Sequence, residues 1–445
     1  MPVDTVLVNA KVCTFKGIVE AGLAIDNGRI VKIAKETNLP KASAKINLNG
    51  FLVLPGLVDT HVHLRDQQLA YREDFASGTA AAAAGGVTTV VDMPNNRPVT
   101  MSVQTLRERM QLAEKRILVN VAFNSAFPSR VEEMPLIVNE GAVGFKLYLL
   151  QQIGGINIDD DNALQNAFKT AAKTKVPICV HAEDKAALEK AQKNMRDKGR
   201  NDAEAFLEAH PSSAEVKAIQ RAVMLAKNSG AHVHVCHVSS EEGLNAVLKA
   251  KKAGLAVSCE VTPHHLLLTS DAMKDHGNFA LMLPPLRAKK DIGALWKALG
   301  KGLIDTVASD HAPHSLEEKT ASSIWDVKPG IAGLETMLPL MLNEISCGRL
   351  TIRQLVQLTA EKPAEIFRLK NRGSLSEGCF ADLVVVNLKR EHKIDASRFY
   401  SKAKFSPFDG WKAKGKPVKT FVNGWLVMDE GEIVAKPETG HIIRG

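Results

Sequence analysis

The sequence lacks the features of an exported or membrane-bound protein. Its six cysteines show no Cys-x-x-Cys spacing, and most lie in apolar, strand-like segments, which is typical of a reducing compartment. The start of the chain has no basic segment ahead of an apolar one, and no uninterrupted apolar run reaches membrane length. We therefore expect a cytoplasmic protein that is neither exported nor inserted into a membrane.

Internal repeats and low-complexity tracts are also missing, apart from an alanine run at residues 80–84. The formal net charge is +8, but the basic residues are spread along the chain and are densest at residues 402–419. We interpret that stretch as a solvated face, so nucleic acid is not an expected partner. A chain of 445 residues with 45% hydrophobic residues is long enough for one large domain and a smaller satellite.

The most informative motif is His-Val-His-Leu-Arg-Asp at residues 61–66, at the end of an apolar segment. Side chains alternate along a strand, so His61 and His63 project together and can bind one metal ion. Imidazole is a preferred ligand of zinc, but two ligands leave the coordination shell incomplete. A pair alone also fits two strand histidines satisfied by backbone hydrogen bonds, so the metal hypothesis needs partners.

Four candidate partners lie at the ends of other apolar segments. Lys146 is in the run at residues 142–149, where a bare ammonium is costly, whereas a neutral amine can form a carbamate that bridges two cations. His181 and His237 end the runs 176–182 and 231–238, and Asp310 follows residues 306–309. Taken singly, these residues also fit a snorkelling lysine, core histidines and a helix N-cap.

The order of the predicted elements joins these signals. Short apolar segments occur at residues 58–63, 88–93, 117–123, 142–148, 176–182, 231–238, 255–261 and 303–309. Helical patterns lie between them at residues 74–84, 102–115, 161–175, 213–228, 240–252 and 289–300. Eight strands alternating with helices predict an α/β fold, a (β/α)8 TIM-type barrel, whose active site lies at the carboxyl ends of the strands.

The chain ends have a different pattern. Residues 23–33 alternate around Asn27-Gly28, which indicates a hairpin with a type I′ turn. Residues 382–386, 420–428 and 432–434 repeat the strand and turn signals. We expect the two ends to pair into one small β-sandwich, with parts at 1–54 and 371–445 on either side of a barrel at 55–370.

The motifs together resemble those of the dihydroorotase family in the amidohydrolase superfamily. The matching segments are residues 61–66, 92–96, 144–148, 180–183, 236–239, 309–314 and 330–336, and they occur in the same order as in that family. The resemblance implies a zinc-dependent cyclic amide hydrolase that interconverts N-carbamoyl-L-aspartate with L-dihydroorotate and water, a step of de novo pyrimidine biosynthesis.

The resemblance also implies a role for each site residue. His61, His63 and Asp310 hold one Zn²⁺, His181 and His237 hold a second, and N6-carboxylated Lys146 bridges them. A water molecule shared by the two metal ions is the nucleophile, and Asp310 acts as the general acid and base. Arg65, Asn95 and His314 bind the substrate carboxylate, for which the planar guanidinium is suited.

The remaining histidines receive no catalytic role. His232 and His234 alternate with valines, so we expect them to face away from His237 and to pack against the helices. Cys236 shares their parity, although some relatives use the equivalent cysteine, with residues matching Glu260 and His265, around a third metal ion. A third metal site at these residues is therefore a further expectation from the resemblance.

Three departures from the family pattern bear on the substrate. Gln67-Gln68 stands where many relatives have Pro-Gly, and Leu283 stands where many have a polar residue, so one substrate contact is in doubt. The loop 151–157 lacks the threonine that relatives place at its tip, while Gly154 and Gly155 would permit lid motion.

Two other functions stay open at this point. A hydantoinase or allantoinase acts on a related cyclic amide, although Arg65 and Asn95 favour an acidic ring. A non-catalytic barrel would assemble with aspartate transcarbamoylase, a partner of some dihydroorotases, but here no metal ligand is missing. A homo-oligomer is compatible with either function.

Overall fold

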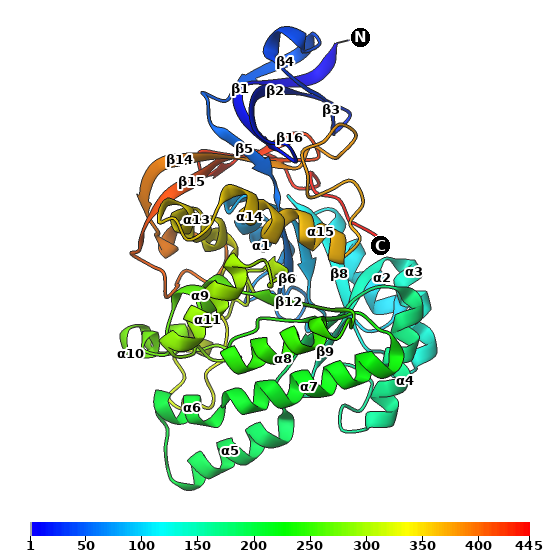
Figure 1. Cartoon of the computed structure of the whole chain (residues 1–445), viewed down its shortest axis with the longest axis vertical. Coiled ribbons are helices and arrows are strands. Elements are labelled where there is room, and N and C mark those ends of the chain that lie inside the picture. Colours follow the sequence, from blue (N-terminus) through cyan, green and yellow to red (C-terminus); the bar gives the residue numbers. More distant parts are fainter. Residues whose placement is uncertain (1) are drawn as a thin grey trace.

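The computed structural model describes residues 2–445 and contains the predicted barrel (Figure 1). Its parallel strands pair in chain order. They are β6 (Leu57–Val62), β7 (Val87–Asp92), β8 (Asn120–Ala126), β9 (Ala142–Tyr148), β10 (Ile178–His181), β11 (Val233–Val235), β12 (Val257–Val261) and β13 (Thr306–Val307). A parallel bridge between Val62 and His311 brings the end of the sheet back to its first strand. The prediction of an eight-stranded barrel is therefore confirmed, although several strands are shorter than expected.

The barrel strands consist of buried residues on both faces, as expected for a sheet enclosed by helices. The helices that match the predicted segments are α1 (Phe75–Ala84), α2 (Val103–Glu114), α4 (Asp161–Thr174), α7 (Ser212–Ser229), α8 (Glu241–Lys252) and α11 (Lys289–Gly300). Asp74, Ser102, Asp160 and Ser240 cap four of these helices through side-chain oxygens, which satisfies backbone N–H groups of the first turn.

Several helices were not predicted. The longer ones are α3 (Met134–Glu140), α5 (Lys185–Asp197), α6 (Ala203–Ala209) and α13 (Leu334–Ser346). The short ones are α9 (Pro263–Leu267), α10 (Ala272–His276), α12 (Leu316–Lys319), α14 (Ile352–Val356) and α15 (Lys362–Ile366). The helices α5 and α6 lie in the long connection between β10 and α7, and α12 lies in the loop after β13, so the additions elaborate the barrel without changing its strand order.

The second sheet is built from both ends of the chain. Its strands are β1 (Val3–Thr14), β2 (Gly17–Asp26), β3 (Arg29–Ala34), β4 (Ala42–Asn47), β5 (Leu52–Pro55), β14 (Leu383–Lys393), β15 (Lys412–Val422), β16 (Trp425–Asp429) and β17 (Glu432–Ile433). The antiparallel pairing of β5 with β14 joins the two ends, as Figure 1 shows above the barrel. Positive φ angles of 48° at Asn27 and 72° at Gly28 fit the predicted turn.

Residues from both ends share one core, which confirms that they form a single sandwich-like unit. Leu7, Leu23, Leu383 and Phe421 belong to the same buried cluster. The division into 1–54, 55–370 and 371–445 stays a prediction, and Met1 lies outside the described residues.

The interior of the barrel is filled at one end. Val58, Val91 and Val143 form a buried cluster with Phe367. Ile443, near the C-terminus, is partly buried and packs against this cluster. The segment that contains Ile442 also pairs with Val121 of β8. Apolar side chains thus fill the barrel near the amino ends of β6, β8 and β9.

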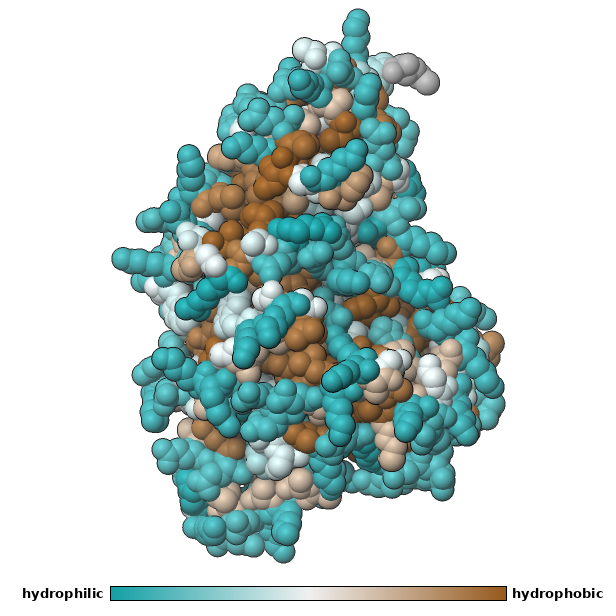
Figure 2. All heavy atoms as spheres, viewed as in Figure 1, coloured by the Kyte–Doolittle hydropathy of each residue, from teal (hydrophilic) through white to brown (hydrophobic). Residues whose placement is uncertain are grey.

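The surface is largely hydrophilic on the face shown in Figure 2, where polar side chains cover most of the barrel and hydrophobic ones gather over the domain made from the chain ends. No helix among residues 2–445 combines the length and the hydropathy needed to cross a bilayer.

Candidate metal centre and active site

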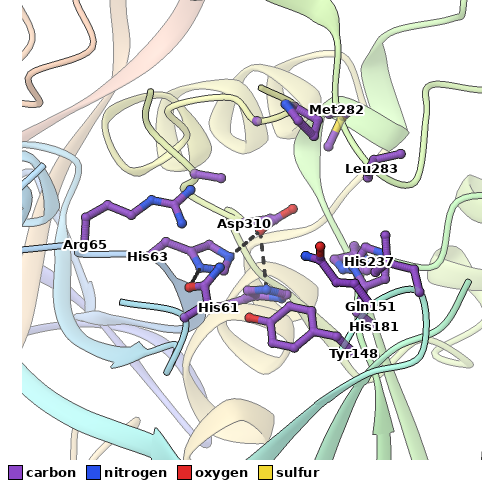
Figure 3. A pocket seen from close by; sticks show the side chains of 15 residues that line it. His61, His63, Arg65, Tyr148, Gln151, His181, His237, Met282, Leu283 and Asp310 are labelled. Carbon is purple, nitrogen blue, oxygen red and sulfur yellow. Dashed lines mark hydrogen bonds and ion pairs between the residues drawn. The ribbon is translucent and has the colours of Figure 1, made fainter. Parts of the chain in front are cut away.

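A cavity of about 110 Å³ lies at the carboxyl ends of the barrel strands (Figure 3). Seven of the nine residues predicted for the site line it: His61, His63, Arg65, Asn95, His181, His237 and Asp310. The other two, Lys146 and His314, contact residues of the lining. The structure therefore gathers all the predicted residues in one place, from six different strands and the loops that follow them.

The first group of candidate metal ligands is His61, His63 and Asp310. The Nε2 atoms of both histidines lie 3.3 Å from Oδ1 of Asp310. In Figure 3 the two rings point at that carboxylate. These three ligand atoms lie within 4.8 Å of one another, a spacing that fits a metal ion.

Each of these histidines is oriented by its second ring nitrogen. Nδ1 of His63 donates to Oδ1 of Asn95 at 2.7 Å, and Nδ1 of His61 forms a short hydrogen bond with Glu260, which is fully buried. A proton on Nδ1 leaves the Nε2 lone pair free to face Asp310. Outer partners of this kind are the usual means by which proteins orient metal-binding histidines.

The second group contains His181 and His237, whose rings lie 4.5 Å apart in an edge-on arrangement. Nε2 of His181 donates to Glu183 at 2.8 Å. Nδ1 of His237 is buried and has no hydrogen-bond partner among the described residues. A buried, unpaired imidazole nitrogen is costly, and a metal ion would satisfy it.

Lys146 lies beside the first group, where it contacts His61, and is fully buried. Its Nζ is 3.2 Å from Nε2 of His61 and 3.0 Å from Sγ of Cys236. Burial lowers the pKa of the amine, but Cys236, Tyr148 and Glu260 raise it and the net direction is upward. Burial raises the pKa of Cys236 and of Tyr148, so both are neutral near pH 7 and Glu260 supplies the negative charge.

Three histidines of the site, His61, His63 and His237, are in the protonation state that a metal ligand needs. Burial lowers the pKa of His61, and it lowers the pKa of His63 and His237 well below the ordinary value. Arg65 adds to the effect on His63, and His181 to that on His237. Neutral imidazoles bind a cation without first losing a proton.

Arg65 supplies the positive charge of the cavity. Its side chain is buried, and within residues 2–445 no carboxylate lies at ion-pair distance from it. Burial and then Arg72 lower the pKa of the guanidinium to about 10, so it stays charged at neutral pH. Its Nη2 lies 3.4 Å from Nε2 of His314, and its Nε has no partner among the described residues.

The expected orientation of His234 and Cys236 is wrong. Nε2 of His234 donates to Glu260 at 3.1 Å, and Cys236 contacts Lys146, so both side chains face the barrel interior. The parity argument fails because β11 ends at Val235 and His237 has a left-handed backbone with φ of 35°. His232 contacts Ser258, which also contacts His234. A chain of polar contacts therefore leads from His232 through Ser258 and His234 to Glu260.

The possible third metal site has a partial counterpart. His61, Cys236 and Glu260 place ligand atoms within 4.8 Å of one another. His265 is not part of this group, because its ring nitrogens contact Thr262 at 2.9 Å and the carbonyl of Pro284 at 3.0 Å.

The three sequence departures have structural counterparts. Gln67 adopts φ of 51°, and Leu283 lines the cavity as an apolar residue. A side chain at Gly154 would meet the carbonyl of Phe127 at 2.7 Å, and one at Gly155 would overlap Ser129. The glycines thus allow the base of the loop to pack closely, which favours an anchored segment over a hinge.

Sequence reasoning assigned no role to several lining residues, among them Tyr148 and Met282. The hydroxyl of Tyr148 is buried and has no hydrogen-bond partner among residues 2–445. Strand parity contained a signal for it, because Lys146 and Tyr148 lie two positions apart in β9 and share a face.

These residues form a candidate metal site at the carboxyl ends of the strands of a (β/α)8 barrel. The profile of the amidohydrolase family matches residues 52–427, and the chain belongs to this family. An L-hydantoinase of Paenarthrobacter aurescens is 35% identical over 99% of this chain and 98% of its own length. A dihydroorotase of Methanothermobacter thermautotrophicus is 37% identical over 93% of this chain and 92% of its own.

Solved structures agree on the fold. An L-hydantoinase from Arthrobacter aurescens superimposes with a TM-score of 0.96 and 34% identity, with complete coverage of both chains. A D-hydantoinase gives a TM-score of 0.92 at 28% identity, covering 99% of this chain and 98% of its own. The relatives thus include both hydantoinases and a dihydroorotase.

Proposed function

We propose that the protein is a dihydroorotase that interconverts N-carbamoyl-L-aspartate and L-dihydroorotate in de novo pyrimidine biosynthesis. The observation that supports this choice is Arg65, a buried cation without a carboxylate partner among residues 2–445, in the wall of the cavity. A buried charge is costly unless it is paired. Dihydroorotate has a carboxylate on its ring and would provide that partner.

The substrate carboxylate would bind between Arg65 and His314, with Nδ2 of Asn95 as a further donor, since Oδ1 of Asn95 already accepts from His63. Burial lowers the pKa of His314 to about 3, despite its contact with Glu318, so this ring is neutral near pH 7. The charge that selects the acid therefore belongs to Arg65. A planar guanidinium can hold a carboxylate through two hydrogen bonds.

The reacting end of the ring would lie between the two groups of candidate ligands. His61, His63 and Asp310 would hold one zinc ion, His181 and His237 a second, and carboxylated Lys146 would bridge them. When bound, the zinc ions lower the pKa of a water molecule and polarise the carbonyl under attack. Asp310 faces the cavity and would transfer the proton between this water and the ring nitrogen.

The test combines metal analysis with an assay of dihydroorotate hydrolysis. We expect about two zinc ions per chain and measurable turnover in both directions, both lost on treatment with a chelator and restored by Zn²⁺. Inactivity toward dihydroorotate in a fully metal-loaded protein would exclude the proposed reaction.

Hydantoin hydrolysis is the second candidate. Met282 and Leu283 form an apolar part of the cavity wall, opposite the metal ligands in Figure 3, and suit an apolar ring substituent. The extensive match to an L-hydantoinase points the same way. Rates on dihydroorotate and on a 5-benzylhydantoin distinguish the two, because a buried unpaired arginine should favour the acid.

Three further expectations stay predictions. They are a third metal ion at His61, Cys236 and Glu260, an association with aspartate transcarbamoylase or with further copies of the chain, and a cytoplasmic location.

A further inference from the structure

Lys319 is a buried lysine outside the metal centre. It ends the short helix α12, and its side chain is fully buried. Its Nζ donates to three backbone carbonyls, those of Leu281 at 3.0 Å, Lys328 at 3.2 Å and Gly330 at 3.0 Å. An ammonium group has three protons, so each of them has an acceptor.

The charge of Lys319 has no ionic partner among the described residues, because its hydrogen bonds all go to carbonyls. Burial lowers the pKa of the amine to about 7. The three acceptors oppose this change, because they bind the ammonium in preference to an amine, which has only two protons. Burying a charge without an ionic partner is costly, which indicates that the surrounding loops need the three hydrogen bonds of Lys319.

The three carbonyls belong to two segments of the cavity wall. Leu281 immediately precedes Met282 and Leu283, and the segment 328–330 contributes Pro329 and Gly330 to the same wall. The two segments also contact each other directly, since the N–H of Gly330 donates to the carbonyl of Leu281 at 2.9 Å. Lys319 therefore lies behind four lining residues without lining the cavity itself.

One of these segments, 328–330, also supports His314. Its Nε2 contacts the carbonyl of Pro329 at 3.1 Å and lies 3.4 Å from Arg65. A shift of residues 328–330 would move the partner of His314 and, through it, the proposed site of the substrate carboxylate. Asp310 precedes Lys319 in the connection after β13, but the hydrogen bonds of Lys319 all go to backbone carbonyls and none to a candidate metal ligand.

We infer that Lys319 is a positioning residue that ties the 281–283 and 328–330 segments together and so fixes the substrate-binding wall opposite the metal centre. This inference rests on the proposed function for the identity of the substrate. The wall that would bind the substrate thus has a supporting residue of its own, separate from the residues that orient the metal ligands.

The test compares Lys319→Met with wild type in the metal-loaded enzyme. Methionine has a similar length and no donor, so we expect KM for dihydroorotate to rise about tenfold or more, with kcat changed less than about threefold and metal content unchanged. Lys319→Gln retains a donating amide, so its KM for dihydroorotate should fall between those of wild type and Lys319→Met. Lys297→Met, at an exposed lysine of α11, is the control for a lysine-to-methionine change and should match wild type.

The results separate two kinds of failure. If wild type with full metal does not act on dihydroorotate, the proposed function is wrong. If wild type is active and KM of both Lys319 variants stays within about twofold of it, the positioning role is wrong. A parallel loss of metal, kcat and binding would also overturn it, since it would show that Lys319 supports the whole barrel. If the methionine variant does not fold, KM of the glutamine variant decides.

Discussion

Replacing Arg65 by methionine is the sharpest test of substrate choice. Arg65 adopts φ of 54°, and its carbonyl accepts a hydrogen bond from Arg109 at 2.8 Å. Methionine retains this backbone contact, and as another non-glycine residue it has a similar conformational cost. The substitution therefore removes the guanidinium and little else. Loss of a buried cation without a carboxylate partner in residues 2–445 should leave the free energy of unfolding unchanged or slightly higher.

The magnitude follows from the bonds that the guanidinium would make. A hydrogen bond between charged groups contributes about 1.5–3 kcal/mol, and two such bonds to one carboxylate share part of their effect. A loss of about 2–4 kcal/mol in the transition state lowers kcat/KM for dihydroorotate by roughly 30-fold to 1000-fold. Dihydrouracil lacks the carboxylate, so its kcat/KM should fall much less.

The assay measures kcat/KM on both substrates, together with zinc content and thermal stability. Arg65→Lys keeps the charge but not the planar guanidinium. Its kcat/KM for dihydroorotate should therefore lie between those of wild type and Arg65→Met. Equal losses on both substrates would refute the reasoning, because they would show that Arg65 holds the site together and does not select the acid.

Three further changes test other parts of the site. Lys146→Ala should lose most bound zinc and activity, both partly restored by a small carboxylic acid with bicarbonate, and an alanine variant with two metal ions and normal turnover would exclude the carbamate bridge. Tyr148→Phe should keep its metal and lower kcat by about tenfold to a hundredfold if the unpaired hydroxyl donates to the substrate, whereas unchanged kinetics would leave it a packing role. Leu283→Asn should lower the rate on 5-benzylhydantoin relative to dihydroorotate, and an unchanged ratio would show that this residue does not contact the ring substituent.

The fold could be predicted because its signals are periodic. Eight apolar segments alternate with helical patterns, and two Asn-Gly turns, at Asn27 and Asn423, indicate the hairpins at the chain ends. The metal ligands could be predicted because each ends or follows a barrel strand, and those ends meet at one rim. Neither inference needs knowledge of side-chain contacts.

The supporting residues could not be predicted in the same way, because their partners are distant in the sequence. Glu260 orients His61 from 199 positions away, and Lys319 contacts carbonyls up to 38 positions away. Glu260 and Lys319 show no spacing pattern of their own. Their roles depend on which loops meet at the rim, and this is a property of the closed barrel.

Backbone strain explains both the error at His234 and the shape of the site. Arg65, Asp66, Gln67, His237 and Asp310 all have positive φ, between 35° and 55°, although none is glycine. Such a conformation costs about 1–2 kcal/mol per residue, so each must be held by its surroundings. Asp66 accepts hydrogen bonds from the N–H groups of Gln67 and Phe75, and Arg109 donates to the carbonyl of Arg65.

The strained residues follow β6, β11 and β13 at the rim of the barrel, where a left-handed residue reverses the direction of the chain. The alternation of a strand then no longer determines where the next side chain points. His237 and Asp310 reach the cavity by this reversal, and the parity of β11 therefore assigned His234 and Cys236 to the wrong face. Five of the fourteen non-glycine residues with positive φ among residues 2–445 lie at this rim, and the rigid barrel around them can hold backbone conformations of this cost in the place where the candidate ligands must meet.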